Sequence, residues 1–203
     1  MNRRRVLQGL IAVAAGGGVA VVAARRYAAP DAPPLQTVAD SGAALTATHV
    51  AAMQQNWRTL LADGVRPPSP ADKLNLSDAE WRKRLTAPQY NVLREEGTER
   101  AGTSPLNAEK RAGVYACTGC ALPLFTSEMK YESGTGWPSF FTLIPGVFGT
   151  KKDFHLIYAR TEYHCLRCGG HHGHLFEDGP KPTGLRYCNN GVALTFIPKS
   201  AKA

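Results

Sequence analysis

Hydrophobic residues with helical spacing identify the first segment with a predicted structure beyond the N-terminal region. Between Thr46 and Ala62, apolar side chains recur three or four positions apart and fall on one side of a helix, and Gly64 is suited to end it. These apolar residues are Val50, Met53, Trp57, Leu60 and Leu61. A stripe of this kind is typical of packing rather than of a cofactor site, so the segment is predicted to cover part of a core.

Two shorter helices are predicted before position 100. Ser77-Asp78-Ala79-Glu80 matches a capping box and begins a helix that runs through Leu85. Pro88 suits the first turn of another helix over Gln89–Glu95, which Gly97 is expected to end.

After Gly113 the pattern changes to short β-type runs separated by Gly, Pro and Asp, which predicts a small antiparallel β domain. The predicted strands are Val114–Cys117, Phe154–Ala159, Thr161–Cys165, Leu185–Cys188 and Val192–Ile197. Asn189-Asn190-Gly191 predicts a tight turn that folds the last of these strands back on the strand carrying Cys188. The expected fold is therefore mainly β, a small antiparallel domain preceded by short helices.

The N-terminus has the features of an export signal. Arg3-Arg4-Arg5-Val6-Leu7 resembles a twin-arginine motif, and Val6–Ala24 follows without a charge. We expect residues 1–29 to direct the protein to the periplasm; retention as a membrane anchor is the alternative, because the uncharged run is long enough to span a bilayer. Residues 30–75 are interpreted as a linker and helical extension, and residues 76–203 as the main domain.

The net charge excludes a nucleic-acid footprint. The 203 residues carry a formal charge of +8, but five arginines lie in the predicted signal, which has no acidic residue. Without that segment the charge falls to +3, and no basic stripe interleaved with aromatics remains.

Four of the five cysteines form two Cys-x-x-Cys pairs, which predict a tetrahedral metal site. The predicted zinc ligands are Cys117, Cys120, Cys165 and Cys168. Four thiolates leave no open coordination position, so the zinc would be structural. Iron in the same ligand set, two disulfides or a redox-active pair are alternatives, and His164 or His171 beside the second pair is a weaker ligand candidate.

The fifth cysteine, Cys188, is the candidate nucleophile. Sulfur attacks as thiolate, and a free thiol with a pKa of about 8.5 is mostly protonated at neutral pH. Strand alternation places Arg186 on the same face, where its guanidinium, with turn amides and nearby imidazoles, is expected to favour the anion. A lone cysteine is more often a small buried hydrophobe.

Imidazoles and one tryptophan complete the candidate site. His171, His172 and His174, with a glycine among them, suggest a loop beside the metal that presents imidazoles. Trp137, in Gly136-Trp137-Pro138-Ser139-Phe140, fits either the core or an apolar wall that holds a methyl group.

From about Trp81 to Pro198 the chain resembles the R-type methionine sulfoxide reductases. The matching stretches are Ser104-Pro105-Leu106-Asn107, Gly113-Val114-Tyr115-Ala116-Cys117, Ser133-Gly134-Thr135-Gly136-Trp137-Pro138-Ser139-Phe140, Arg160-Thr161-Glu162 and Cys165–Asn190. The resemblance implies that Cys188 is the nucleophile, that His171, His174 and Asn190 are polar active-site residues, and that Trp137 packs on the substrate methyl group. It implies a fold of two small antiparallel sheets with helices at the N-terminal side and the structural zinc ligands named above. It also implies substrates that are oxidised proteins or peptides carrying methionine-R-sulfoxide.

The chain departs from the family pattern at two places. Many relatives carry a resolving cysteine before the tryptophan, where this chain has Ser133-Gly134-Thr135-Gly136, so a thioredoxin-like protein or a small thiol is expected to be the reductant. His172 replaces a usually apolar residue and is expected at the pocket rim or facing solvent, and His155 is left without a role. A monomer is expected, and a zinc-stapled binding module without turnover is the alternative function.

Overall fold

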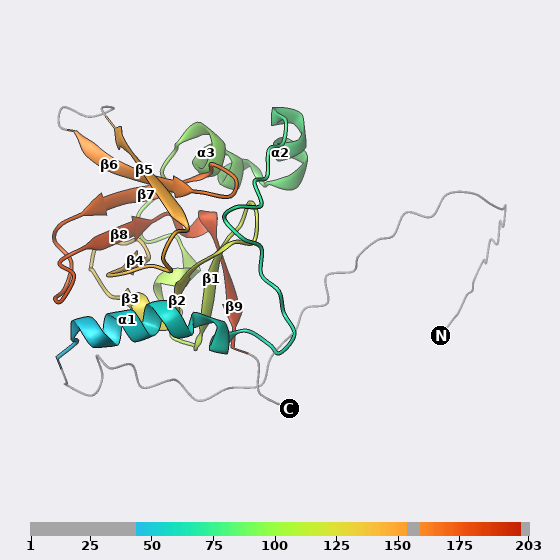
Figure 1. Cartoon of the computed structure of the whole chain (residues 1–203). Coiled ribbons are helices and arrows are strands. Elements are labelled where there is room, and N and C mark those ends of the chain that lie inside the picture. The colour runs from blue at the N-terminus through green and yellow to red at the C-terminus, as the bar shows by residue number, and fades with distance from the viewer. Residues whose placement is uncertain (1–43, 154–158, 200–203) are drawn as a thin grey trace, which may run out of the picture. The chain divides into compact units, whose positions relative to one another are not determined.

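Two antiparallel sheets and several short helices form the part of the chain that the computed structural model describes, residues 44–153 and 159–199 (Figure 1). The predicted export signal, its alternative as a membrane anchor, and His155 lie outside the described residues. Among the helices of the described ranges, none has both the length and the hydrophobicity needed to cross a bilayer.

The predicted amphipathic segment is confirmed as α1 (Ala47–Asn56) followed by a 3-10 helix, η1 (Trp57–Leu60). Thr46 caps α1, because its side chain accepts a hydrogen bond from the amide of His49. The buried residues of this segment are Val50, Met53, Trp57 and Leu60. Val50, Met53 and Trp57 join the core that the rest of the described chain forms.

The two short helices are α2 (Asp78–Arg84) and α3 (Ala87–Glu95). Ser77 and Glu80 form the predicted capping box, in which the Glu80 carboxylate accepts the Ser77 amide at 2.8 Å. α3 begins earlier than predicted, because Thr86 caps it, and its last residue is Glu95, as predicted. The residue that ends it is Glu96, in the left-handed conformation, rather than Gly97.

The strands form a three-stranded sheet in the order β2-β1-β9 and a six-stranded sheet in the order β3-β4-β8-β7-β6-β5, with every pairing antiparallel. The bounds are β1 Gly113–Cys117, β2 Pro123–Thr126, β3 Lys130–Tyr131, β4 Ser139–Phe140, β5 Phe148–Asp153, β6 Arg160–Cys165, β7 His171–Phe176, β8 Arg186–Asn189 and β9 Leu194–Pro198. Short 3-10 helices lie at Pro105–Asn107 (η2), Ser127–Met129 (η3) and Gly191–Ala193 (η4). The predicted fold class is confirmed.

Two predictions within the sheets are wrong, and a third lies almost wholly outside the described ranges. The last strand does not fold back on β8: η4 carries the chain across to the other sheet, where β9 pairs with β1. The histidine run is strand β7 rather than a loop, because it pairs on both sides, with β6 and β8. The strand preceding β6 is β5, Phe148–Asp153, and residues 154–158 of the predicted strand lie outside the described ranges.

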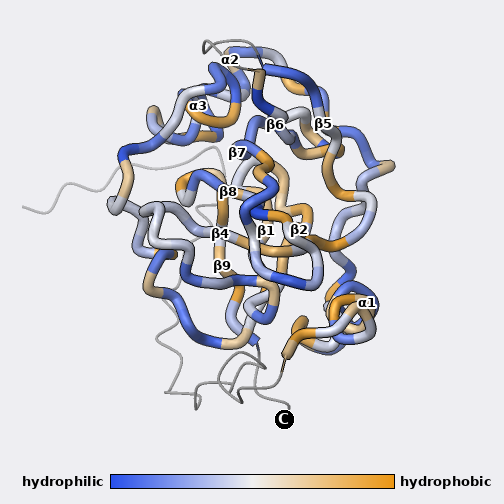
Figure 2. The backbone as a smooth tube through the Cα atoms, turned by 90° about the vertical axis from the view of Figure 1, so that its left-hand side faces the viewer, coloured by the Kyte–Doolittle hydropathy of each residue, from blue (hydrophilic) through white to orange (hydrophobic). Residues whose placement is uncertain are grey.

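The core lies between the two sheets, and Phe125 of β2 is at its centre. Its ring stacks on Phe140 of β4 at a centroid distance of 3.9 Å and also contacts Phe148 and Tyr187 of the six-stranded sheet. Figure 2 shows the corresponding hydrophobic residues along the strands and along α1. Burial of one such ring contributes about 1.5–3 kcal/mol, so the sheets are held face to face mainly by apolar contact.

The segment before α2 is integrated with the main domain. Gln54 of α1 donates a side-chain hydrogen bond to the Thr142 hydroxyl at 2.9 Å. Farther along, the Lys73 ammonium donates to the carbonyl of Leu166 and the Leu74 amide donates to the carbonyl of Arg167. Residues 44–75 therefore pack against the rest of the described chain and also bind the backbone of the second cysteine pair.

Candidate active site and metal centre

A row of directly paired residues crosses the six-stranded sheet and carries its polar chemistry. Directly paired residues in antiparallel strands point to the same face. From β4 to β5 the row consists of Ser139, Cys188, His174, Glu162 and Lys151. The register thus aligns a hydroxyl, a thiol, an imidazole, a carboxylate and an ammonium on the face opposite the aromatic core.

A β-bulge in β7 decides where the three histidines lie. The register between β6 and β7 shifts after Tyr163, which leaves His172 as the extra residue. His171 is thereby brought to the same face as His174, with ring centroids 5.5 Å apart. His172 turns into the core, where it is fully buried with its ring edge against Phe148. The expectation that His172 lies at the pocket rim or in solvent is therefore wrong.

Gly173 allows β7 and β8 to approach closely at this point. A Cβ atom at this position would lie 2.0 Å from the Cys188 carbonyl oxygen. The glycine between the histidines therefore lets the strand of imidazoles pack against the strand that carries the thiol.

A pocket of about 110 Å³ lies over this row of residues. Its lining residues are Thr98, Trp137, Arg160, Gly173, His174, Phe176, Cys188, Asn189 and Asn190. Trp137 is only partly buried and lines the pocket, which favours its prediction as an apolar wall over its prediction as a core residue. His171 does not line the pocket, and its side chain is only 2% exposed. The structure thus brings Cys188, His174, Asn190 and Trp137 together around one opening.

The environment of Cys188 has opposing effects on its ionisation. Burial raises the pKa of the Cys188 thiol, while the charge of Arg186 and hydrogen bonds from Thr135 and Arg186 lower it. Burial has the larger effect, so the pKa is raised overall. The predicted effect of Arg186 is therefore present, but burial outweighs it, and the sequence does not show how deeply the thiol lies.

Arg186 is held by an acid rather than free to bind a ligand. Its Nε and Nη2 atoms donate to the two carboxylate oxygens of Asp178 at 2.7 and 2.9 Å. Its guanidinium also lies 4.2 Å from the ring centroid of Phe176. It shares the face of Cys188, as predicted, but it is not among the residues that line the pocket.

His174 is oriented by a carboxylate that the sequence analysis did not identify. Its Nε2 lies 2.7 Å from Oδ2 of Asp153, which also accepts a hydrogen bond from Arg160 at 2.6 Å. Burial lowers the pKa of His174, and the hydrogen bond with Asp153 opposes that effect. The sequence signal that could have identified Asp153 is its opposite charge to Arg160, with which it is paired at the ends of β5 and β6.

His171 lies one layer behind His174. Its Nδ1 is 3.1 Å from the carboxylate of the buried Glu162, which is in turn 3.2 Å from the Lys151 ammonium. His171 therefore contacts the row of polar residues through Glu162, which belongs to that row. His174 is the imidazole that faces the pocket.

Asn190 is buried and makes two kinds of contact. Its amide nitrogen donates to the carbonyl of His172 at 3.0 Å, and its side-chain oxygen accepts from the backbone amide of Glu99 at 2.9 Å. The side chain therefore joins strand β7 to the loop after α3, and Glu99 is a second residue that the sequence analysis missed.

The other four cysteines lie together and buried. The Sγ atoms of Cys117, Cys120, Cys165 and Cys168 all lie within 4.8 Å of one another. Two pairs are separated by 3.7 and 3.5 Å, whereas a disulfide needs about 2.05 Å, so the two-disulfide alternative does not describe this structure. Four sulfurs 2.3 Å from a zinc ion would be about 3.8 Å apart, so the spacing fits a tetrahedral metal site.

The two cysteine pairs have matching backbones. In each, the residue after the second cysteine is left-handed: Ala121 at φ 62° and Gly169 at φ 71°. The amide of each of these residues donates to the carbonyl of the first cysteine of its pair, Cys117 or Cys165. Each turn therefore presents two thiols toward a common centre.

Arginine side chains hold the outward carbonyls of these turns. Arg84 of α2 donates to Gly119 at 2.8 Å, and Arg94 of α3 donates to Cys168 at 2.9 Å. Arg167 donates across the centre to Cys120 at 2.6 Å. The N-terminal helices thus brace the metal centre through its backbone.

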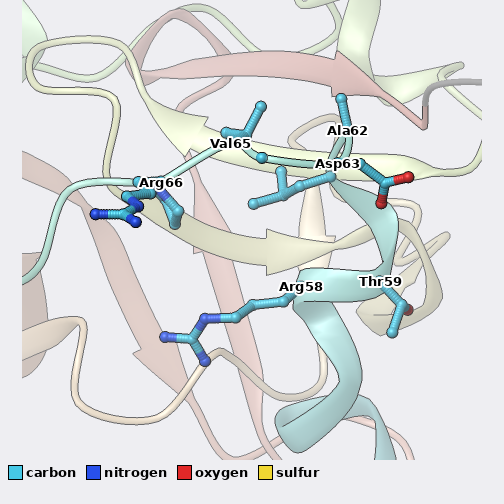
Figure 3. Close-up of a pocket in the computed structure, with 9 residues that line it drawn as sticks. Arg58, Thr59, Ala62, Asp63, Val65 and Arg66 are labelled. Atoms are coloured by element: carbon cyan, nitrogen blue, oxygen red, sulfur yellow. The ribbon is translucent and has the colours of Figure 1, made fainter.

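A larger hollow of about 470 Å³ lies between η1 and the following connector (Figure 3). Its charged lining residues are Arg58, Asp63 and Arg66, and no thiol or imidazole lines it. It therefore lacks the groups that the chemistry of Cys188 requires.

Comparison with known proteins identifies the family of this region. The family model of the SelR domain matches residues 85–198. The peptide methionine sulfoxide reductase MsrB of Agrobacterium fabrum is 50% identical over 127 residues, which are 62% of this chain and 94% of that protein. The corresponding protein of Leptospira interrogans is 50% identical over 125 residues, which are 61% of this chain and 95% of that protein. That of Methanosarcina barkeri is 51% identical over 121 residues, which are 59% of this chain and 85% of that protein.

The matched range contains every residue that lines the 110 Å³ pocket and all four clustered cysteines. Residues 44–84, with α1, η1 and α2, precede it.

Proposed function

The chain belongs to the SelR-domain family of MsrB-type methionine sulfoxide reductases, and from this premise we propose that it reduces methionine-R-sulfoxide in peptides and proteins to methionine. The observation that carries the proposal is the pocket in which Cys188, His174 and Trp137 meet while the other four cysteines lie in a separate cluster.

The first half-reaction uses the Cys188 sulfur as nucleophile. The thiolate attacks the sulfoxide sulfur, the oxygen takes a proton, and the S–O bond to the substrate breaks as oxygen passes to Cys188. Methionine leaves and Cys188 becomes a sulfenic acid. Because burial raises the pKa of the free thiol, the reactive thiolate must form within the pocket, next to Arg186 and Thr135.

His174 is the proposed general acid. It lines the pocket and is paired with Cys188 across the sheet, whereas His171 is buried behind it. The Trp137 ring forms the apolar wall on which the sulfoxide methyl group would pack, and Asn190 also lines the pocket.

An external thiol completes the cycle. All five cysteines lie in the described ranges, and four of them are clustered away from the pocket. One thiol attacks the Cys188 sulfenic acid and releases water, and a second thiol reduces the resulting mixed disulfide. Mass spectrometry of the oxidised, metal-loaded protein tests this, and an intramolecular disulfide to Cys188 would refute it.

The metal we propose is zinc with a structural role. The four sulfurs are buried and have the spacing of a tetrahedral site. Zinc would clamp the turn after β1 to the turn after β6 and take no part in the reaction.

The central experiment is reduction of a peptide containing racemic methionine sulfoxide with a dithiol. The wild-type protein should reduce half of the sulfoxide, the R epimer, and stop there. Cys188→Ser should reduce none. Failure of the zinc-loaded wild type to reduce either epimer would overturn the proposal.

We also propose that residues 1–29 export the protein through the twin-arginine route. The support is the Arg3-Arg4 pair followed by the uncharged run Val6–Ala24. Cell fractionation should place the wild type in the periplasm and a variant with Arg3→Lys and Arg4→Lys in the cytoplasm. Identical fractions for both proteins would contradict it.

A further inference from the structure

Glu99 lies where three segments that build the pocket meet. It follows α3, close to the loop that carries Trp137 and to the segment after β8. Its backbone amide donates to the side-chain oxygen of Asn190 at 2.9 Å, and its carbonyl accepts from the indole nitrogen of Trp137 at 3.0 Å. One peptide segment therefore holds two of the residues that line the pocket.

The Glu99 carboxylate holds a third element. Its two oxygens accept the backbone amides of Gly191 and Val192, which begin the 3-10 helix directly after Asn190. Gly191 is required for this approach, because a Cβ atom there would lie 1.9 Å from the Ser104 hydroxyl and 3.1 Å from a Glu99 carboxylate oxygen. Hydrogen bonds to a charged acceptor are stronger than neutral ones, so the side chain anchors the chain just beyond Cys188.

Glu99 itself does not line the pocket, although its neighbour Thr98 does. A change at Glu99 can therefore reach the reaction only through the placement of Trp137, Asn190 and the segment that follows Cys188. Reaction rates are sensitive to such displacement, since a shift of about 1 Å in positioning can change a rate by about 100-fold.

We propose that Glu99 is a positioning residue of this active site, which fixes the tryptophan wall and the Cys188-Asn190 segment in the arrangement that receives the sulfoxide. This inference rests on the proposed function. It assigns a role to the loop between α3 and β1.

The test compares Glu99→Ala and Glu99→Gln with Glu128→Gln, a carboxylate in η3 outside the pocket. With a sulfoxide peptide and saturating dithiol, Glu99→Ala should lower kcat/KM about 100-fold. Glu99→Gln should lose less, because the amide oxygen can still accept one of the two backbone amides. Glu128→Gln should match the wild type.

A second measurement separates positioning from simple loss of stability. Fluorescence of Trp137, isolated by difference from the Trp137→Phe protein, is quenched with acrylamide at a temperature where circular dichroism shows each variant fully folded. Quenching should increase in Glu99→Ala, because the segment whose carbonyl accepts the indole hydrogen bond loses its anchor to Gly191 and Val192 and no longer holds the ring in place. In Glu128→Gln it should stay at the wild-type value.

The inference is overturned if folded Glu99→Ala keeps wild-type kcat/KM, or if its quenching is unchanged. Should Glu99→Ala fail to fold, the same two readouts on Glu99→Gln decide. A wild-type protein without reductase activity would refute the proposed function instead, and the quenching result would still decide whether Glu99 positions Trp137.

Discussion

The molecule uses cysteine and histidine in two regions with opposite surroundings. In the interior, four cysteines converge within 4.8 Å and His172 is fully buried among aromatic rings. In the pocket, Cys188 and His174 are partly exposed and face each other across paired strands. The same two side chains therefore serve structure in one region and chemistry in the other.

The difference shows that access and neighbours decide the role of a residue here, rather than its type. The clustered thiols are surrounded by one another and by backbone turns, which leaves no space for a substrate. Cys188 has a wall, an acid and an opening beside it. Burial of the Cys188 thiol raises its pKa, and the thiol nevertheless remains open to the pocket.

Removal of the metal should have the largest effect and should act first on the interior. Zinc contributes on the order of 10 kcal/mol to folding in small zinc modules, so a strong chelator should lower the melting temperature sharply and abolish activity together with it. Calorimetry with and without chelator, followed by zinc re-addition, measures this. A chelated protein that melts like the loaded one would show that the cluster carries no structural metal.

Replacement of the pocket thiol should produce the opposite pattern. Cys188→Ser should lose at least about 10³-fold in kcat/KM, because no other thiol lines the pocket, while melting temperature and zinc content stay at wild-type values. Cys168→Ser is the matched variant and should lose zinc and stability. Loss of zinc from Cys188→Ser would contradict the division between the two regions.

Removing the charge behind His174 should weaken the pocket more moderately. In Asp153→Asn the hydrogen bond that opposes the burial effect is weakened, so the pKa of His174 should fall further. A general acid must be protonated, and activity is lost as pH rises through its pKa. The descending limb of the pH–rate profile should therefore move to lower pH, with a loss of about 10- to 100-fold at neutral pH.

The comparison for Asp153→Asn is His174→Gln, in which the descending limb of the pH–rate profile should disappear. An Asp153→Asn protein whose profile keeps the wild-type shape would assign Asp153 to packing alone.

Spacing in the sequence predicted the two regions well, because ligand motifs depend on short-range geometry. The Cys-x-x-Cys pairs specify their own turns, and the alternation of Arg186 and Cys188 within one strand requires no knowledge of the partner strand. The capping box at Ser77 is likewise a local feature, and the structure contains it.

Features that depend on pairing partners could not be predicted. A bulge at His172 arises from the register between β6 and β7, and it alone sends that imidazole into the core. The crossing of β9 to the other sheet depends on which strand edge is available. Glu99 holds Trp137 and Asn190 through its backbone, which leaves no side-chain pattern in the sequence.

The smallest expected effect concerns the interior histidine. Burial lowers the pKa of His172 to about 3, and its ring nitrogens have no well-formed hydrogen bond to described residues. Between pH 3 and about 6.5 the unfolded chain therefore binds one proton more than the folded one, and the free energy of unfolding falls by about 1.4 kcal/mol per pH unit as pH decreases.

His172→Leu should remove this dependence and, at pH 7.5, raise the free energy of unfolding by about 1–3 kcal/mol, because no polar atom is left unpaired. Denaturant unfolding of both proteins at several pH values between 4.5 and 7.5 measures the difference. The two curves should diverge as pH falls from about 6.5, the pKa of an unfolded histidine, and run parallel above it. Parallel curves throughout would mean that His172 is protonated equally in the folded and unfolded states, and that burial does not lower its pKa.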